Sequence, residues 1–409
     1  MSNGDSRNDH RIRLCLLVSS LEFGGAERQV VTLARSFDHD RVTAVVCSLS
    51  EKVPLAASLP HREQSLRIVR KWGRFDFTTV FRVARLLRRN RTDVVHAFLF
   101  DAEIVARLAA LIARVPVVVA SERNTDYTRP LLHRAALWLT EPLFDVMIAN
   151  SQAGKRFNMR TLGLSESRIE VVHNGVDVEH FRPDAAAGGA FRRKLNIPAD
   201  DRVMGMVGSF KRQKAHDAFL RTAARVRGQM PRTWFLIVGD VLRENLTESN
   251  RYKEEIKALA ESLGLADRCL FLESQKDMKA VYNACDLTVL LSTREGTPNV
   301  LLEAMACGVP VIASDVADNA IIVLDKVTGY VVPKNDEATP AEHAVELLGD
   351  PAKRKEMGAA AREHVRLEYS INTATEKMEK VYRTYLGRKH RYVSARRWRS
   401  ISVKARTSS

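Results

Sequence analysis

Two glutamates, Glu295 and Glu303, flank a segment that favours the start of a helix. Thr297 is placed to cap this helix and the following proline suits its first turn. The backbone amides near Asn299 and Val300 then lack helical partners and form an anion site. Glu303 follows Asn299 by one turn on the same face. The two acids could hold hydroxyls of a phosphorylated sugar ligand; the alternative is a capping acid followed by a solvent-facing glutamate.

The elements around this segment predict where it lies. Residues 287–292 and 309–314 are apolar runs of strand length. Gly308 suits a left-handed helix stop, and Pro310 prevents the helix from continuing. A strand, a short helix and a second strand form a βαβ unit with parallel strands. The loop 293–296 therefore lies at the carboxyl edge of the first strand, where open α/β sheets bind ligands.

The spacing of this stretch resembles a family signature. Glu295, seven residues and Glu303 are followed by Ala-Met-Ala-Cys-Gly and Pro-Val, as in the family-4 retaining glycosyltransferases of the GT-B fold. The resemblance extends from Gly24-Gly25-Ala26-Glu27-Arg28 through His173-Asn174-Gly175-Val176-Asp177 to Thr328-Gly329. It implies an α/β protein with two Rossmann-like domains face to face, a cleft between them and a C-terminal helix that crosses back. It also implies that Glu303 holds the ribose of a sugar nucleotide and that Glu295 lies beside the transferred sugar.

Two further loops are candidates for binding the donor diphosphate. Residues 203–208 predict a strand, and Lys211, Arg212 and Lys214 follow it at a helix start. Positive side chains beside helix-end amides favour a diphosphate, although a solvated basic loop is the alternative. The family resemblance assigns Lys214 to the diphosphate. Ser209 stands where the family commonly has an arginine, so Lys211 or Arg212 is expected to supply that charge. Gly24 and Gly25, at the first strand-to-helix turn, allow close backbone approach to a ligand.

Two residues of the first half are candidates for the catalytic centre. His96 lies in a predicted strand, and Arg123 follows another strand at residues 115–120. In the resembled family, histidines after these strands face the transferred sugar, but Phe98 stands where a second histidine is common. The alternative for His96 is a buried, hydrogen-bonded core histidine. Arg123 could meet an anionic acceptor group or an acid of the opposite domain.

The length of 409 residues allows two domains with full cores. We expect an N-terminal acceptor domain at 1–172, a sugar-nucleotide-binding domain at 173–368, a crossing helix at 369–387 that packs on the N-terminal domain, and a basic tail at 388–409. The Asn174-Gly175 turn and the small-residue segment 185–190, expected to be a linker, mark the boundary.

The composition is basic, with a formal net charge of +15. Eight Lys or Arg residues lie in 388–409, which has no acid, and the segment 82–91 predicts a basic amphipathic helix. Both favour contact with an anionic membrane; the alternatives are a basic surface helix and a disordered tail. No apolar run is long enough to span a bilayer, and no signal peptide is recognised. Five scattered cysteines favour a reducing cytosol, and no Cys/His cluster has metal-ligand spacing, so neither metal nor cofactor is expected.

The family resemblance implies a metal-independent retaining hexosyltransferase, and the basic segments favour a location at the cytoplasmic face of the membrane. Its donor would be a nucleotide-diphosphate sugar and its acceptor a glycan or lipid-linked hydroxyl in polysaccharide biosynthesis. A sugar-nucleotide epimerase, which shares the GT-B architecture, is the first alternative. A non-catalytic nucleic-acid binder is supported only by the pI of about 9.8, and the chain has none of the familiar nucleic-acid modules.

Overall fold

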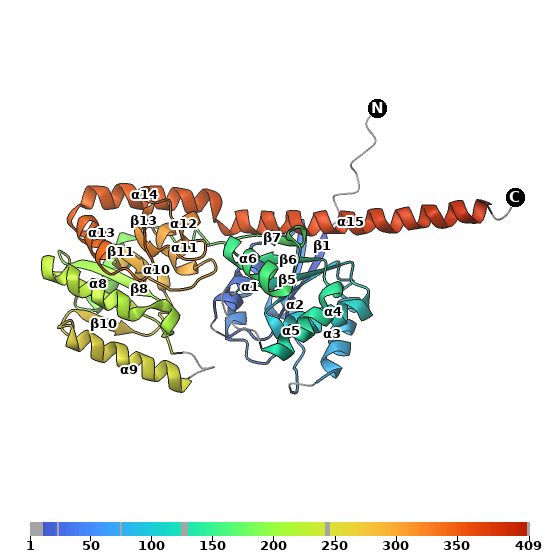
Figure 1. The fold of residues 1–409 in the computed structure, drawn as a ribbon, viewed down its shortest axis with the longest axis horizontal. Helices are drawn as coiled ribbons and strands as arrows, with labels where there is room; N and C mark the ends of the chain where they lie inside the picture. Colours follow the sequence, from blue (N-terminus) through green and yellow to red (C-terminus); the bar gives the residue numbers. More distant parts are fainter. Residues whose placement is uncertain (1–10, 23, 74–75, 124–129, 242–245, 407–409) are drawn as a thin grey trace, which may run out of the picture. The chain divides into compact units, whose positions relative to one another are not determined.

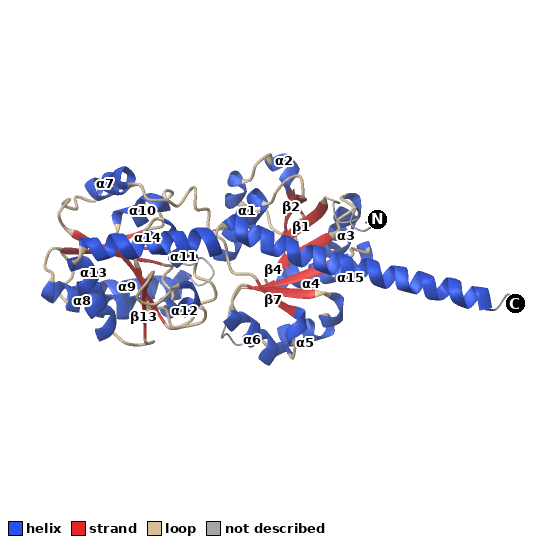
Figure 2. Ribbon diagram, turned by 90° about the horizontal axis from the view of Figure 1, so that it is seen from above, coloured by secondary structure: helices blue, strands red, loops and turns tan. Residues whose placement is uncertain are grey.

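The structure is a computed structural model that describes residues 11–22, 24–73, 76–123, 130–241 and 246–406. It consists of two compact units. Unit 1 contains Met1–His173 and Ile371–Ser409, and unit 2 contains Asn174–Ser370. Each unit has one parallel sheet with helices on its faces (Figures 1 and 2). The prediction of two Rossmann-like domains is therefore confirmed.

Unit 1 has a seven-stranded sheet in the order β3-β2-β1-β4-β5-β6-β7. Alternate residues of β1 face opposite sides: Leu14 and Leu16 join one core, and Cys15 and Leu17 join the other. This burial on both faces explains why the strands read as almost continuous apolar runs. The strands are β1 (Ile12–Val18), β2 (Val42–Ser48), β3 (Leu66–Ile68), β4 (Val94–Phe98), β5 (Val117–Glu122), β6 (Val146–Ala149) and β7 (Ile169–Val171).

Two helix layers cover this sheet. Helices α1 (Gly25–Ser36) and α15 (Ile371–Arg406) pack on the face of Leu14 and Leu16, and α3 (Thr78–Arg89) and α4 (Phe100–Ala113) pack on the face of Cys15 and Leu17. The remaining helical segments are η1 (Pro54–Ser58), α2 (Arg62–Ser65), α5 (Leu131–Leu139), η2 (Glu141–Leu143), α6 (Gln152–Leu162) and η3 (Glu166–Arg168). The strand-to-helix turn at Gly24 is as predicted, because α1 begins at Gly25.

Helix α15, at the C-terminal end of the chain, belongs to unit 1 together with the N-terminal segment Met1–His173. Its early turns bury Met378 and Tyr382 in the core beneath α1, so the predicted packing of the final helix on the N-terminal sheet is observed. The helix continues to Arg406, past residue 387, where the predicted crossing helix ends and the basic tail begins. In the part of the chain that the structure describes, neither α15 nor any other helix is long and apolar enough to cross a membrane.

Unit 2 has a six-stranded parallel sheet in the order β10-β9-β8-β11-β12-β13. The predicted βαβ unit is present as β11, α11 and β12, and β11 pairs with β12 in parallel. The strands are β8 (Arg202–Val207), β9 (Thr233–Val238), β10 (Cys269–Leu272), β11 (Leu287–Leu290), β12 (Val311–Ser314) and β13 (Gly329–Val332). The helices are α7 (Ala185–Lys194), η4 (Arg212–Lys214), α8 (His216–Gln229), α9 (Leu246–Ser262), α10 (Met278–Ala284), α11 (Asn299–Ala306), α12 (Asn319–Ile322), α13 (Ala338–Gly349) and α14 (Pro351–Glu368).

The small-residue segment 185–190 is not a linker; it forms the first half of α7. The Asp184 side chain caps the helix by accepting a hydrogen bond from the Ala187 amide at 2.9 Å. A Cβ atom on Gly188 would lie only 2.1 Å from the carbonyl oxygen of Asn283. The small side chains therefore let α7 pack closely on α10, and the prediction mistook this packing requirement for flexibility.

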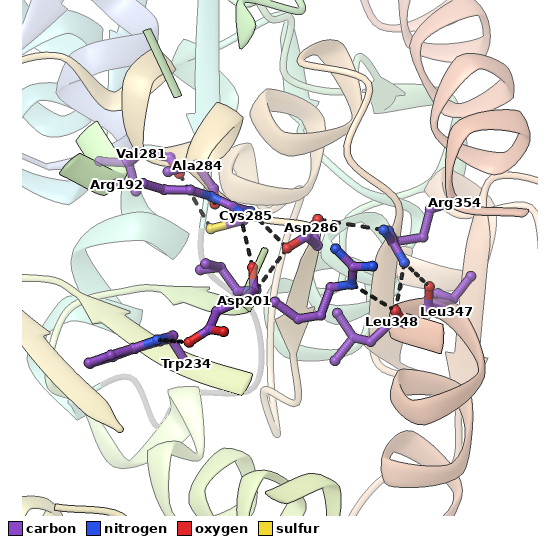
Figure 3. Close-up of polar contacts among 12 residues, drawn as sticks. Arg192, Asp201, Trp234, Val281, Ala284, Cys285, Asp286, Leu347, Leu348 and Arg354 are labelled. Carbon is purple, nitrogen blue, oxygen red and sulfur yellow. Dashed lines mark hydrogen bonds and ion pairs between the residues drawn. The ribbon is translucent and has the colours of Figure 1, made fainter. Parts of the chain in front are cut away.

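The amino edge of the unit 2 sheet is held by a network of charged side chains (Figure 3). Asp286, just before β11, accepts hydrogen bonds from Arg192 at 2.7 Å and from the Val203 amide at 2.8 Å, and Arg354 lies 3.7 Å from its other oxygen. Arg192 also donates to the Ala284 carbonyl at 2.8 Å. The network therefore connects α7, α10 and α14 to the starts of β8 and β11.

A second acid at this edge, Asp201, directly precedes β8. It accepts hydrogen bonds from Arg232 at 2.8 Å and from Trp234 and Arg268 at 3.0 Å. Burial alone would raise the pKa of the Asp201 carboxyl, but these three donors outweigh it and lower the pKa. Asp201 is therefore ionised and structurally paired.

Candidate functional site

The opposite, carboxyl edge of the unit 2 sheet brings two predicted site residues together. The Nζ atom of Lys214 lies 2.6 Å from Oε1 of Glu295, and these side chains are only 15% and 8% exposed. The Thr293 amide donates to the Gln213 carbonyl at 2.8 Å, which joins the loop after β8 to the loop after β11. Parallel strands place their following loops at one edge, so residues separated by about eighty positions can form one site.

Two glycines allow close packing around the loop after β8. A Cβ atom on Gly239, after β9, would lie 1.9 Å from the Gly208 carbonyl oxygen, which is impossible without a backbone shift. A Cβ atom on Gly208 would meet the Lys214 side chain at 3.4 Å. The aliphatic stem of Lys214 therefore packs over Gly208, and its ammonium group reaches Glu295.

The N-terminus of α11 lies directly after Glu295. Thr297 was predicted to cap this helix, but this prediction is wrong: Pro298 occupies the N-cap position and provides no side-chain cap. Asn174 fixes the chain at the start of α11, because its Nδ2 donates to the Thr297 carbonyl at 3.0 Å and to Oδ1 of Asn299 at 2.7 Å. The amides of the first turn have no carbonyls a turn earlier in the helix and can bind an anion.

Glu303 lies one turn further along α11. Its Oε2 accepts a hydrogen bond of 2.6 Å from the hydroxyl of Tyr282 on α10. Tyr282 is fully buried, so the bond fixes one oxygen of the half-buried carboxylate. The sequence analysis missed Tyr282, although a tyrosine inside the apolar run of α10 signals a hydroxyl that needs a buried partner.

The other two cations of the loop after β8 lie differently. Arg212 is exposed, and its guanidinium forms an ion pair of 2.8 Å with Glu255 on α9 and lies 4.9 Å from the ring centroid of Tyr252. Lys211 precedes η4 and is partly exposed. The structure thus places Lys214, rather than Arg212, against Glu295.

The predicted site residues of unit 1 fall into two groups. Gly24 is the N-cap of α1, and Gly25 is its first residue. A Cβ atom on Gly24 would lie 2.0 Å from Oε2 of Glu27, so a larger residue would displace that side chain. The glycine turn therefore brings an acid back over the start of α1.

His96 and Arg123 form the second group. His96 is fully buried in β4, and its Nδ1 lies 2.8 Å from the Tyr382 hydroxyl of α15. Its ring stacks on Phe98 with centroids 4.2 Å apart, and the Arg123 guanidinium lies 5.0 Å from the Phe98 ring centroid. Burial, and then the charge of Arg123, lower the pKa of His96 well below its usual value. A neutral histidine without exposed surface matches the core-histidine interpretation, because its ring is enclosed by the core and paired with the Tyr382 hydroxyl.

Comparison with known proteins agrees with this architecture. The family "Glycosyltransferase Family 4" matches residues 23–180, and "Glycosyl transferases group 1" matches residues 189–364. A D-inositol 3-phosphate glycosyltransferase of Mycobacterium tuberculosis is 32% identical over 310 residues, which cover 72% of this chain and 62% of the relative. The same figures hold for a Mycobacterium bovis relative of that name. The chain thus spans less than two thirds of the length of these relatives.

Solved structures show the same fold. HepE of Anabaena, crystallised with UDP, superposes with a TM-score of 0.79 at 21% identity and covers 90% of this chain and 99% of its own. WaaG, a glycosyltransferase involved in lipopolysaccharide biosynthesis, gives a TM-score of 0.65 at 18% identity over 91% of this chain and 99% of its own. The predicted GT-B fold is confirmed, and the chain belongs to the group 1, family 4 glycosyltransferases.

Proposed function

We propose that this protein is a retaining glycosyltransferase that moves a hexose from a nucleotide-diphosphate sugar to an acceptor hydroxyl. The observation that carries the proposal is the 2.6 Å contact between Lys214 and Glu295 at the start of α11. A cation, an acid and a helix N-terminus at one edge of the sheet are the parts needed to hold a diphosphate and the sugar attached to it.

The ion pair supports a specific order of events. An arriving diphosphate competes with Glu295 for the Lys214 ammonium, and its two charges attract Lys214 more strongly than one carboxylate does. Glu295 then turns its oxygens to hydroxyls of the sugar. Lys214 and the first-turn amides of α11 stabilise the negative charge that grows on the diphosphate as the glycosidic bond breaks.

Glu303 holds the other end of the donor in this proposal. Its carboxylate accepts hydrogen bonds from the ribose hydroxyls, and Tyr282 keeps it in one orientation through the 2.6 Å bond. A fixed carboxylate loses less conformational freedom when the donor binds. In this proposal unit 2 is the donor-binding domain, and unit 1, with Arg123, is the acceptor domain.

The proposed acceptor is a glycan or lipid-linked hydroxyl at the cytoplasmic face of a membrane. The support is chemical: residues 388–409 carry eight cations and no acid, a pattern attracted to anionic lipid surfaces. A protein of the same fold, WaaG, is a glycosyltransferase involved in lipopolysaccharide biosynthesis, and the mycobacterial relative is named as a D-inositol 3-phosphate glycosyltransferase.

A thermal-shift panel of nucleotide sugars, including UDP-glucose, tests the donor site. The wild-type protein should gain stability from at least one donor, because a ligand that binds only the folded state stabilises it. Glu303→Ala should lose this gain, whereas Glu356→Ala, an exposed acid on α14, should retain it. A Glu303→Ala protein that gains as much as the wild type would remove Glu303 from the site. Product analysis with and without an acceptor distinguishes transfer from epimerisation, which needs no acceptor.

A further inference from the structure

The outer side of helix α5 in unit 1 is unusually apolar. Leu131, Leu132, Trp138 and Leu139 are between 68% and 80% exposed. They form two adjacent pairs that are seven residues, or about two helical turns, apart, so all four lie on one side of the helix. Leu137 is buried on the other side of α5. A helix that only covers a core should be polar toward solvent, so α5 has a second apolar side that needs another explanation.

A cavity beside α5 adds to this apolar surface. It has a volume of about 320 Å³ and is lined by Leu131, Ala135, Trp138, Phe144 and Leu162. Arg107 also lines it and is held by Glu103 at 2.8 Å. Because Leu131 and Trp138 belong both to the cavity and to the exposed side of α5, an apolar group that meets α5 could extend into the cavity.

Helix α3 presents aromatic and basic side chains in one line. Phe77, Phe81, Arg85 and Arg88 are exposed and are spaced by four, four and three residues, which places them along one side of the helix. Phe77 and Phe81 are 71% and 64% exposed. The rings therefore lie toward the N-terminal end of this line and the guanidinium groups toward its C-terminal end.

The two helices belong to one layer. Helix α4 contacts both α3 and α5, and the three run side by side along one face of the unit 1 sheet (Figures 1 and 2). Leu111 of α4 adds a further apolar residue that is 62% exposed. We call the exposed side of these helices, with Phe77, Phe81, Leu111 and the four apolar residues of α5, the α3–α5 outer face.

The charge of α3 and α5 on this face is one-sided. The sequences Thr78–Arg89 and Leu131–Leu139 contain five arginines and no aspartate or glutamate. A second copy of the chain placed symmetrically on this face would bring the same arginines together without acids to pair with them. A surface rich in phosphate groups would instead be complementary to these arginines.

We propose that the α3–α5 outer face docks on an anionic lipid bilayer. The leucines and aromatic rings enter the interface between headgroups and acyl chains, and the arginines contact lipid phosphates. This inference deepens the proposed function by identifying the surface that brings unit 1 to a membrane-bound acceptor. It rests on the proposed function only for the location of the acceptor, because docking itself requires no donor.

Cosedimentation of the full chain with lipid vesicles tests the proposal. The wild type should bind vesicles made of equal parts phosphatidylglycerol and phosphatidylcholine, and bind phosphatidylcholine vesicles much more weakly. Trp138→Glu and Arg85→Glu should each weaken binding by about tenfold or more. The matched controls are Leu367→Glu, on an exposed apolar residue of α14, and Arg225→Glu, on an exposed cation of α8; both should bind like the wild type.

Three results would overturn the proposal. The first is that Trp138→Glu and Arg85→Glu bind as tightly as the wild type. The second is that binding is lost only when Arg396, Arg397 and Arg399 are changed to glutamate, which would assign docking to the C-terminal segment. The third is a wild-type dimer, seen by light scattering, that Trp138→Glu converts to a monomer. The UDP-glucose thermal shift, measured in parallel, separates a failure of this surface from a failure of the donor site.

Discussion

The two edges of the unit 2 sheet both carry partly buried ion pairs, but the pairs are built differently. At the amino edge, Asp286 is bound by Arg192 and by the Val203 amide, and Arg192 also holds the Ala284 carbonyl (Figure 3). At the carboxyl edge, Lys214 meets Glu295 across two loops joined by backbone hydrogen bonds. The first network ties strands and helices of the core, whereas the second connects loops beside a helix N-terminus.

This difference separates structural charge from charge available to a ligand. A guanidinium has several donors in fixed directions, and at the amino edge they are directed at backbone carbonyls and a carboxylate that the fold supplies. The Lys214 ammonium is a single charge on a flexible stem, so it can exchange Glu295 for a stronger anion without disturbing a strand. In the proposed function, the same sheet therefore uses arginine pairs for stability and a lysine pair for binding.

The largest expected effect is on stability at the amino edge. Asp286→Ala leaves Arg192 and Arg354 without their carboxylate in a region where these arginine side chains are only 16% and 11% exposed. We expect the free energy of unfolding to fall by about 3 kcal/mol. Urea unfolding followed by circular dichroism measures this change. A loss as small as that of an exposed pair such as Arg366–Glu363 would show that the amino-edge network is not structural.

The next effect concerns ligand binding at the carboxyl edge. Lys214→Met keeps most of the aliphatic stem over Gly208 but removes the charge. We expect kcat/KM for the donor to fall by about 100-fold because the leaving diphosphate loses a preorganised cation. Stability should also fall, but by less than in Asp286→Ala, because only one charged group, the 8% exposed Glu295, loses its lysine partner. Transfer assays and urea unfolding of the same sample measure both quantities. A variant that unfolds readily but keeps its kcat/KM would reverse the assignment of the two edges.

A smaller effect is expected for the tyrosine that orients Glu303. Tyr282→Phe removes one hydrogen bond of 2.6 Å to the carboxylate. We expect KM for the donor to rise by about tenfold with a smaller change in kcat. Tyr330→Phe is the matched control, because Tyr330 donates a similar bond of 2.8 Å to Glu346 on α13. Equal KM values for the two variants would leave Tyr282 with a purely structural role.

The smallest expected effect is on the pH dependence of folding stability, which differs between the two edges. Burial lowers the pKa of His216, at the start of α8, to about 4, below the value near 6.5 expected when unfolded. Between these pH values the unfolded chain binds the proton and the folded chain does not, so stability falls as the pH falls from about 6.5 to 4. The lowered pKa of Asp201 affects stability in a lower pH range. The stability that it contributes is fully present above the unfolded pKa of about 4 and is lost as the pH falls below that value.

Urea unfolding across this pH range measures the His216 effect. His216→Phe keeps a ring stacked on Phe210, whose centroid lies 4.7 Å from that of His216, but does not titrate. We expect the stability of this variant to vary less between pH 6.5 and 5 than that of the wild type, by about 1 kcal/mol. An unchanged slope would mean that His216 is solvated and titrates normally.

Much of the fold is encoded in local sequence features. The strands of both sheets are apolar runs, and Gly308, with φ of +73°, ends α11 in the left-handed conformation that the sequence predicted. The candidate site could be predicted from the sequence where a motif fixed the spacing, as for Glu295 and Glu303. It could not be predicted where contacts join distant segments. Tyr282 reaches Glu303 from another helix, and Arg212 is drawn to Glu255 on α9, which no local pattern indicates.

Residue type also led to wrong predictions where contacts with other segments determined the local structure. The segment 185–190 has the composition of a flexible linker, but close contact with α10 requires its small residues. Thr297 has the side chain of a helix cap, but the proline after it takes the N-cap position and Asn174 holds the Thr297 carbonyl. In both places a residue outside the segment determined the structure.

The most direct test of the donor site is calorimetric titration of UDP-glucose into the wild type, Lys214→Met, Glu303→Ala and the double variant. The account predicts that the wild type binds, that each single change weakens binding by about tenfold or more, and that the double variant shows no measurable heat. Binding by the double variant with wild-type affinity would contradict the assignment of the donor to the carboxyl edge of unit 2.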